Sequence, residues 1–369
     1  MGRATVWELA RLGHRVRLLD SDPRAAARVV RAYGGGRATA AVAESAEPDA
    51  LAAVLRGAAV VINCAPHAMN LVAMQAALRA GCHYLDLGGL FHTTRRQLLL
   101  DGEFKDGSLL AVLGMGSAPG VANVLARAGA DGLRRVRAIR VYNGGADFTR
   151  YRAPVAFGFA PGTMLDELTL PPMIFTGGRF RAVAPLSGAE EIEFELGVQK
   201  VHLSLHSEVA TLPLTYREKG IRECSFKIAY DPVLIERLTL LADLGLTDPD
   251  RGRLGVAPRD VLLDCFRRLP PPPAFIDDRD TLAVIVEGED DRGPVVVRHD
   301  VTARPQRRPP LSAVARHTGF PPALVAGMIL EGRIRARGVL PPERCVPVAP
   351  LVAALAERGM NVRRKVERP

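Results

Sequence analysis

The first part of the chain alternates short apolar runs with segments of helical periodicity, and this alternation constrains the fold more than any other feature. Residues 59–64, 83–87 and 109–113 are short runs made mostly of apolar residues, which is typical of strands buried on both faces. Segments with helical periodicity lie at 70–80 and 121–133. Regular alternation of this kind predicts a parallel sheet with helices on both of its faces.

The chain opens within such an alternating unit. An amphipathic helical pattern begins at Gly2 and ends before Gly13, and an apolar run at 16–20 then finishes in Asp20. A glycine at the start of a helix and an acid at the end of the next strand form the second half of a dinucleotide-binding βαβ unit. We therefore expect Gly2 to be the third glycine of a Gly-x-Gly-x-x-Gly loop and to bind the cofactor. We also expect the first strand and the first two glycines to be absent, with the native start lying upstream.

The ends of the predicted strands carry the other cofactor candidates. Asp20 is expected to accept hydrogen bonds from ribose hydroxyls, which favours NAD, while Arg24 nearby keeps NADP possible. Capping of the helix that starts at Pro23 is the alternative role for Asp20. Asn63 and Pro66 end a buried strand, and a polar side chain there needs a partner. We expect a cofactor amide or ribose to supply it, with a purely structural bond as the alternative.

Asp86 and Tyr84 are the predicted catalytic residues. They stand two positions apart on one strand, so their side chains leave on the same face. Leu85 and Leu87 flank the acid, and desolvation there is expected to raise its pKa toward the range that suits proton exchange with an amine or water. The alternative for Asp86 is a structural role in holding a loop.

Two features complete the predicted sites. The loop 114–120 runs from a strand into a helix, and its free amides can hold a carboxylate at the helix N-terminus. The five cysteines are scattered without a Cys-x-x-Cys pair, which indicates reduced thiols in a cytoplasm and argues against a metal site.

From residue 143 the pattern changes to short β-rich pieces punctuated by glycine and proline. Residues 175–180 read as a hairpin with a glycine turn, 201–205 as a strand, and 281–286 as a strand that pairs with 294–299. These patterns predict a second domain with a mostly antiparallel sheet.

The predicted fold class is therefore α/β, a Rossmann-type parallel sheet without its first strand joined to an α+β domain. We expect a dinucleotide-binding domain over 1–142, a substrate and dimerisation domain over 143–305, and a helical segment over 306–369 that packs back on the first domain. Residues 311–333 resemble a helix-turn-helix that turns near Gly319. Its second helix lacks side chains that read bases, so we interpret it as a packed helical pair.

Composition argues against two classes of partner. The net charge is +9, but the arginines are spread along the chain without interleaved aromatic residues, so we expect no nucleic acid partner. No apolar stretch approaches the roughly 20 residues of a membrane helix, and no secretory signal is visible at the start. We therefore expect a cytoplasmic protein, and an antiparallel second domain that favours a homodimer or larger homo-oligomer.

Seven strings, in order, carry a resemblance to a known family. They are VVINCAP at 60–66, HYLDLGG at 83–89, GSAPGVAN at 116–123, LHSEVATLP at 205–213, GIRECSFK at 220–227, VAPRDVL at 256–262 and GVLPPE at 338–343. Together they resemble the saccharopine dehydrogenase family, particularly the bacterial branch that includes lysine 6-dehydrogenase. The similarity spans essentially the whole chain.

This resemblance implies an NAD(P)-dependent oxidoreductase that oxidises the CH–NH or CH–NH2 bond of an amino acid of the saccharopine or lysine type. Hydride passes to the nicotinamide, and the resulting imine is hydrolysed. Ala118 stands where fungal saccharopine reductases carry an acid, which weakens saccharopine itself as the substrate. A catalytically silent relative with a structural or regulatory role is the alternative, because most of the cofactor loop is absent.

The resemblance also implies a set of substrate-binding residues from both domains. We expect Arg222 to clamp an α-carboxylate and Glu208 to hold an ammonium, with surface salt bridges as the alternative for each. The expected contacts are Pro119, Gly120, Asn123, His206, Glu208, Thr211, Arg222 and Lys227.

Overall fold

The computed structural model describes residues 1–43 and 47–368, and the parallel strands of its first domain form two separate sheets. An inner sheet has four parallel strands in the order β16-β5-β4-β3, and an outer sheet pairs β1 with β2, also in parallel. The strands are β1 Val16–Asp20, β2 Ala38–Val42, β3 Val60–Asn63, β4 His83–Asp86, β5 Leu110–Val112 and β16 Gly338–Leu340. The α/β class is confirmed.

Helices alternate with these strands. They are α1 Gly2–Arg11, α2 Pro23–Tyr33, α3 Pro48–Leu55, α4 Asn70–Ala80, α5 Leu90–Gln97, α6 Asp101–Asp106 and α7 Val121–Ala130, with 3-10 turns η1 His67–Met69 and η2 Leu98–Leu100. The helix predicted over 70–80 is confirmed as α4, and Gly81 ends it in a left-handed conformation with φ +70°. In the described residues no helix combines the length and hydropathy that a membrane span needs.

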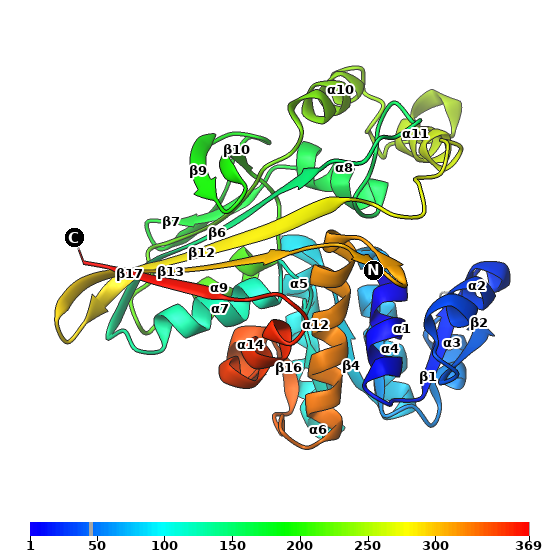
Figure 1. The fold of residues 1–369 in the computed structure, drawn as a ribbon, viewed down its shortest axis with the longest axis horizontal. Coiled ribbons are helices and arrows are strands. Elements are labelled where there is room, and N and C mark those ends of the chain that lie inside the picture. Colours follow the sequence, from blue (N-terminus) through cyan, green and yellow to red (C-terminus); the bar gives the residue numbers. More distant parts are fainter. Residues whose placement is uncertain (44–46, 369) are drawn as a thin grey trace.

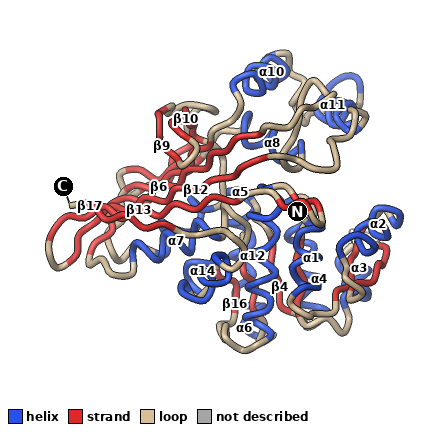
Figure 2. Tube along the Cα trace, viewed as in Figure 1, coloured by secondary structure: helices blue, strands red, loops and turns tan. Residues whose placement is uncertain are grey.

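The second domain is built on a nine-stranded, mostly antiparallel sheet. Its main order is β17-β13-β12-β6-β11-β10-β9, with β7 and β8 joined at β11. The strands are β6 Arg135–Asp147, β7 Met173–Thr176, β8 Arg179–Ala182, β9 Glu190–Phe194, β10 Gly197–Leu203, β11 Glu223–Ile228, β12 Asp278–Asp290, β13 Gly293–Ala303 and β17 Arg363–Glu367. The predicted hairpin is the β7–β8 pair, and the predicted pairing of 281–286 with 294–299 is part of β12–β13. Figure 2 shows β6, β12 and β13 running together as long strands.

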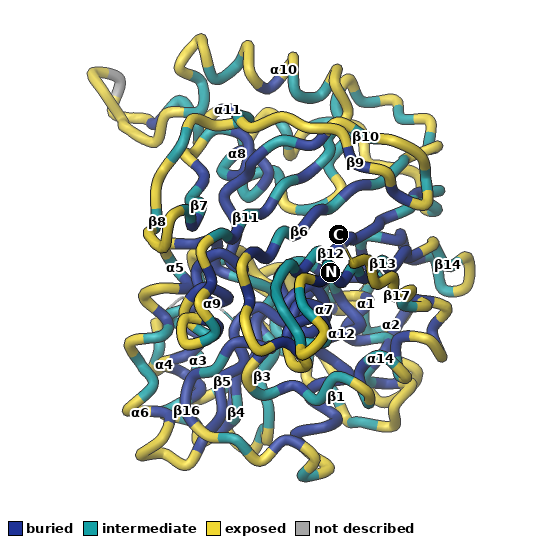
Figure 3. The backbone as a smooth tube through the Cα atoms, turned by 90° about the vertical axis from the view of Figure 1, so that its left-hand side faces the viewer, coloured by how far each residue is buried: buried dark blue, intermediate teal, exposed yellow. Residues whose placement is uncertain are grey.

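Helices flank this sheet. They are α8 Pro161–Thr169, α9 Glu208–Thr215, α10 Pro232–Asp243 and α11 Pro258–Arg267, with a 3-10 turn η3 Gly252–Leu254. Helices α8, α10 and α11 share a small apolar core of their own, which includes Leu165, Leu238 and Leu262. In contrast, α7 packs between the domains against β12 and β13, and Figure 3 shows the buried backbone concentrated in that part of the molecule.

The last part of the chain returns to both sheets. Its elements are β14 Gln306–Arg307, β15 Pro310–Leu311, α12 Ala313–Leu330, α13 Pro342–Cys345 and α14 Val348–Ala356, together with β16 and β17. Helix α12 lies along α1, as Figure 1 shows. The sequence pattern predicts only helices here, but β16 extends the inner parallel sheet and β17 pairs with β13.

The interpretation of 311–333 as a helical pair with a turn near Gly319 is wrong, because α12 is one continuous helix. Gly319 faces α1 closely: a side-chain carbon there would lie 2.8 Å from the Ala4 side chain and 2.9 Å from the Met1 carbonyl oxygen. The Thr5 hydroxyl also donates to the Gly319 carbonyl at 2.9 Å. The glycine therefore permits close packing of two helices and does not make a turn.

Candidate active site

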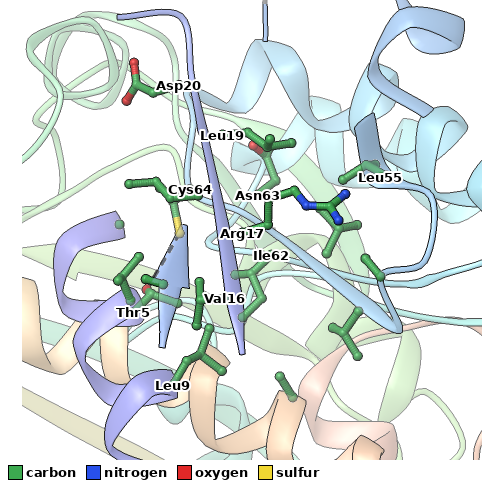
Figure 4. Close-up of a pocket in the computed structure, with 18 of the residues that line it drawn as sticks. Thr5, Leu9, Val16, Arg17, Leu19, Asp20, Leu55, Ile62, Asn63 and Cys64 are labelled. Carbon is green, nitrogen blue, oxygen red and sulfur yellow. Dashed lines mark hydrogen bonds between the residues drawn. The ribbon is translucent and has the colours of Figure 1, made fainter. Parts of the chain in front are cut away.

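A cavity of about 1570 Å³ separates the outer sheet from the inner sheet. All four residues predicted to bind a cofactor line it, namely Gly2, Asp20, Asn63 and Pro66. Figure 4 shows Asp20 and Asn63 at this cavity, at the ends of β1 and β3. The structure therefore brings these four residues together, although they are far apart in the sequence.

The carboxylate of Asp20 is exposed and makes few contacts. It accepts one hydrogen bond, from the Asp22 backbone N–H at 2.9 Å. Asp22, in contrast, is the N-cap of α2 and accepts from the Arg24 N–H at 2.8 Å. The capping alternative for Asp20 is therefore wrong, and its carboxylate keeps acceptor capacity for a ligand.

Asn63 is satisfied by the protein itself. Its side-chain oxygen accepts from the Ala65 N–H at 3.1 Å, and its amide donates to the Asn70 side chain at 2.9 Å. Asn70 in turn donates to the Gly88 carbonyl at 3.1 Å. The expectation that a cofactor supplies the partner of Asn63 is corrected in favour of the structural alternative, because this network ties the ends of β3 and β4 together.

Asp86 is completely buried and holds two loops. Its carboxylate accepts from the backbone N–H groups of Gly88 at 2.9 Å and Gly114 at 2.6 Å. It also accepts from Gln97 at 2.6 Å and from the Tyr84 hydroxyl at 3.0 Å, so Tyr84 lies on the same face as expected. Burial raises the pKa of Asp86 despite these donors. The contacts support the loop-holding alternative, and proton exchange by Asp86 and Tyr84 stays a prediction.

The loop after β5 is packed without spare room. Pro119 lies against two glycines, because a side-chain carbon at Gly88 or Gly114 would lie 2.8 Å or 2.6 Å from it. Gly120 has φ +126°, and a side-chain carbon there would lie 2.2 Å from the Gly116 carbonyl oxygen. In this rigid loop the Ser117 hydroxyl is buried without a hydrogen-bond partner among residues 1–43 and 47–368. An unpartnered buried hydroxyl at this place is suited to a ligand.

Asn123 and Thr211 belong to a buried structural network. Asn123 accepts from the Gly120 N–H at 3.0 Å and donates to Glu343 at 2.9 Å and, more weakly, to Thr211 at 3.4 Å. Thr215 donates to the other oxygen of Glu343 at 3.0 Å. The network links α7, α9 and α13, so these contacts favour a role in joining domains over the expected direct contact with substrate.

A compact polar cluster forms where the second domain meets the first. His206 contacts Glu208 through Nδ1 at 2.5 Å and Glu167 through Nε2 at 3.8 Å. The Tyr230 hydroxyl donates to Glu167 at 2.5 Å, and the imidazole stacks on Phe226 with ring centres 3.8 Å apart. Burial lowers the pKa of His206, but the two carboxylates outweigh it and the net direction is upward. Burial raises the pKa of Glu167.

This cluster faces the carboxyl ends of the inner strands. The hydroxyl of Ser207, next to His206, accepts from the Gly89 N–H at 3.2 Å, directly after β4. Asp166, next to Glu167, contacts His67 at 3.2 Å just after β3 and also pairs with Arg259 at 2.8 Å. Ligands of parallel sheets bind beyond these strand ends. The cluster therefore lies where a substrate of this fold is expected.

Two predicted substrate contacts lie elsewhere. Arg222 is exposed and lies beside Gly178 in the β7–β8 turn, and Lys227 pairs with Glu190 at 2.6 Å. Alternation along β11 turns Lys227 to the face opposite Phe226, which stacks on His206. The structure therefore does not bring Arg222 and Lys227 to the polar cluster. Lys227 makes the salt bridge of the alternative, and a substrate contact by either residue stays a prediction.

Glu167, Tyr230 and His67 were missed by the reasoning from sequence. The adjacent acids Asp166 and Glu167 in an otherwise apolar helical stretch were the available signal. No three His, Cys, Asp or Glu side chains are arranged to hold a metal ion in the portion described, and all five cysteines are free thiols.

The fold and site define a two-domain protein with a dinucleotide-binding parallel sheet and a polar cluster above its strand ends. Two family models match in sequence: the saccharopine dehydrogenase NADP binding domain over residues 1–112 and the saccharopine dehydrogenase C-terminal domain over 116–360. The chain belongs to the saccharopine dehydrogenase family, so it is an oxidoreductase of that type with an NAD(P)-binding domain. The models divide the chain within the loop after β5, before the boundary predicted at 142.

Individual relatives agree with this assignment. Carboxyaminopropylagmatine dehydrogenase from Synechocystis is 25% identical over 320 residues, which cover 82% of this chain and 79% of the relative. The apo saccharopine dehydrogenase (L-Glu forming) from Saccharomyces cerevisiae superposes with a TM-score of 0.73 at 15% identity, covering 100% of this chain and 98% of the yeast chain. The second likeness shows a shared fold.

Proposed function

We propose that the protein oxidises the CH–NH bond of an amino acid that carries a secondary amine, or forms that bond in the reverse direction. In the oxidation, carbon loses a hydride and nitrogen loses a proton, which leaves a C=N bond that water cleaves to a carbonyl compound and an amine. A bound nicotinamide supplies the hydride acceptor. The polar cluster of His206, Glu208 and Glu167 above the strand ends is the observation that carries this proposal.

The residues at the cavity suit a nicotinamide dinucleotide. The exposed carboxylate of Asp20 can accept from ribose hydroxyls at the end of β1. Helix α1 begins at Gly2 with no acidic residue in its first turn, so its free N–H groups can receive phosphate oxygens. The carboxylate of Asp20 disfavours a 2′-phosphate, and we propose NAD as the preferred nucleotide, with NADP as the alternative because Arg24 is near.

The cluster supplies the proton chemistry. Glu208 is fully buried, and its Oε1 has no hydrogen-bond partner in the described part of the chain. Its other oxygen holds His206, which also lies near Glu167, so the three groups share protons as one coupled unit. We assign Glu208 to receive the substrate nitrogen and His206 to take up and return its proton.

The substrate carboxylate is assigned to the loop after β5. Helix α7 begins at Val121, and the unpartnered Ser117 hydroxyl lies just before it. Backbone N–H groups at a helix N-terminus bind anions. The name of the Synechocystis relative describes a carboxyl-bearing aminopropyl derivative of an amine, which supports a substrate with both a carboxylate and a secondary amine. A catalytically silent relative is not favoured, since the family models match through both domains.

Glu208→Gln tests the proposal, because it keeps the shape and removes the carboxylate. Reduction of the nicotinamide is measured with a panel of amino acids that carry a secondary amine. Glu190→Gln is the matched control, because Glu190 lies in β9, away from the polar cluster, and is exposed. We expect kcat to fall about 10²-fold or more in Glu208→Gln and the limb of the pH profile that reports the cluster to shift. An unchanged kcat and pH profile would remove the cluster from the chemistry.

A further inference from the structure

Helix α8 carries two neighbouring acids that contact different domains. Glu167 belongs to the polar cluster of the second domain, where one oxygen lies 3.8 Å from Nε2 of His206 and the other accepts from Tyr230 at 2.5 Å. Asp166 instead reaches the first domain, where its carboxylate lies 3.2 Å from Nε2 of His67. Consecutive residues of a helix are held about 100° apart around its axis. One helix therefore keeps the two contacts in a fixed relation.

Helix α8 is held firmly by its own neighbours. Arg259 of α11 pairs with Asp166 at 2.8 Å and donates to the Gly162 carbonyl, in the first turn of α8, at 2.8 Å. The apolar side of α8 is buried in the small core that it shares with α10 and α11, and Figure 1 shows the three helices together at one end of the second domain. A displacement of Asp166 therefore moves the helix as a unit, and Glu167 moves with it.

His67 begins the turn that follows β3. The residues just before it, 63–66, all line the cavity between the two parallel sheets. The His67 ring is held from one side, because Nε2 faces Asp166 whereas Nδ1 is buried with no hydrogen-bond partner in the described part of the chain. Asp166 is thus the polar group that fixes the orientation of the ring. The turn connects the wall of the cavity to α8 across the domain boundary.

The contact between His67 and Asp166 acts on Glu167 through charge as well as through position. The two side chains of the contact are only 24% and 15% exposed, so water screens their interaction incompletely. Burial raises the pKa of Glu167, and the neighbouring Asp166 carboxylate raises it further, against the opposing effects of His206 and Tyr230. A group that holds Asp166 in place therefore also affects how Glu167 holds its proton.

We propose that His67 and Asp166 are positioning residues that couple the nucleotide site to the polar cluster. A nucleotide in the cavity fixes the turn after β3, and the contact between His67 and Asp166 carries that position to α8. Helix α8 then sets how closely Glu167 approaches His206. The inference rests on the proposed function, which places the nucleotide at this cavity and the proton exchange in this cluster. The cluster thus takes its reacting arrangement once the hydride acceptor is bound.

The test follows the imidazole of His206 by NMR in protein labelled with ¹³C in its histidine rings. The chain has eight histidines, and the His206→Gln variant identifies the signal. NADH and NADPH are the probes, and fluorescence titration measures their binding separately. In the unsubstituted protein we expect the nucleotide that binds to shift the His206 signal. In His67→Leu we expect that shift to fall about threefold or more although the nucleotide still binds, because the coupling is removed and the cavity is kept.

Three further variants separate positioning from a general loosening of the helices. His67→Gln places an amide N–H near the position of Nε2, so it should keep more of the shift than His67→Leu. Asp166→Ala removes the other end of the contact and should lose the shift as well, which decides the question if His67→Leu does not fold. Asp264→Asn is the matched control, because its ion pair with Arg268 lies on the exposed surface of α11, and it should leave the shift unchanged.

The remaining outcomes overturn the inference. An equal shift in the unsubstituted protein and in folded His67→Leu means that the nucleotide acts on the cluster without this contact. No shift of His206 with a bound nucleotide means that the two sites are not coupled. An equal loss in His67→Gln or in Asp264→Asn means that the loss is not specific to this contact. These three results leave the proposed function standing, whereas failure of both NADH and NADPH to bind removes the proposed nucleotide site and the inference with it.

Discussion

The inner and outer parallel sheets contain similar apolar runs but differ in how firmly they are held. In the inner sheet, β4 and β5 are almost entirely buried, and the loops that follow them are fixed by Asp86 and Pro119. In the outer sheet, β1 and β2 have no fully buried residue, although their sequences are equally apolar. The comparison teaches that neighbours, more than composition, determine how far a strand is stabilised. In the function that we propose, the inner sheet positions the reacting groups and the outer sheet holds the nucleotide.

The largest expected effect is in the loop of the inner sheet. Gly120→Ala places a side-chain carbon against the Gly116 carbonyl at φ +126°, so we expect a loss of about 3 kcal/mol or more in the free energy of unfolding. Urea denaturation measures it. Gly102→Ala is the matched control, since nothing lies within 4 Å of a side-chain carbon there. Equal stability of both variants would mean that the loop is not rigid.

A pair of truncations compares the two sheets directly. Leu85 in β4 is completely buried, whereas Leu18 in β1 is only partly buried beside the cavity between the two sheets. We expect Leu85→Ala to cost about 2–5 kcal/mol of unfolding free energy and Leu18→Ala less than about 1 kcal/mol. Thermal and urea unfolding of both variants check this difference. Similar costs would contradict the contrast between the sheets.

Asp86→Asn separates loop holding from proton exchange. In the variant, an amide –NH2 can replace the carboxylate oxygen that accepts from the backbone N–H groups of Gly88 and Gly114. We therefore expect the free energy of unfolding to fall by about 2 kcal/mol. Burial raises the pKa of Asp86, so folding favours its protonated form and its contribution to stability declines as the pH rises above its unfolded pKa. The deficit of the variant should therefore be larger at about pH 5 than at about pH 8. Lost turnover at full stability would instead support the catalytic role.

The smallest effect concerns nucleotide choice in the outer sheet. Asp20→Ala removes the carboxylate that we propose accepts from ribose hydroxyls, so we expect the Kd for NADH to rise about tenfold and that for NADPH to change little. Fluorescence titration of the reduced nucleotides gives both values. Asp22→Ala loses the cap of α2, so it should lower the stability of the protein without changing the ratio of the two Kd values. An unaltered ratio in Asp20→Ala would exclude Asp20 from the nucleotide site.

The fold could be predicted from the sequence because its signals are local. Apolar runs and helical periods gave the parallel strands, and the Gly177-Gly178 turn gave a hairpin. The strand β16 could not be predicted, because it has only three residues and its partner β5 lies far away in the sequence. So short a run carries no periodic signal. The continuous helix α12 was also missed, since Gly319 is indistinguishable in sequence from a turn glycine until α1 is seen against it.

The candidate site was predictable only in part, for a similar reason. Gly2 and Asp20 follow a fixed spacing in a known unit, and the structure brings them to one cavity. Asn63 was assigned to a cofactor because its partner Asn70 lies at the start of α4, and spacing in the sequence does not reveal that contact. Glu167 was missed because its meaning depends on His206, which arrives from another element across the domain boundary.

The central claim is that the nicotinamide nucleotide binds along the outer sheet and the start of α1. Hydrogen exchange of the protein with and without NADH and NADPH tests it most directly. We predict slower exchange in the first turn of α1 and around Asp20 with one of the two nucleotides, and no change in β12. No protection of these segments by either nucleotide would contradict the account.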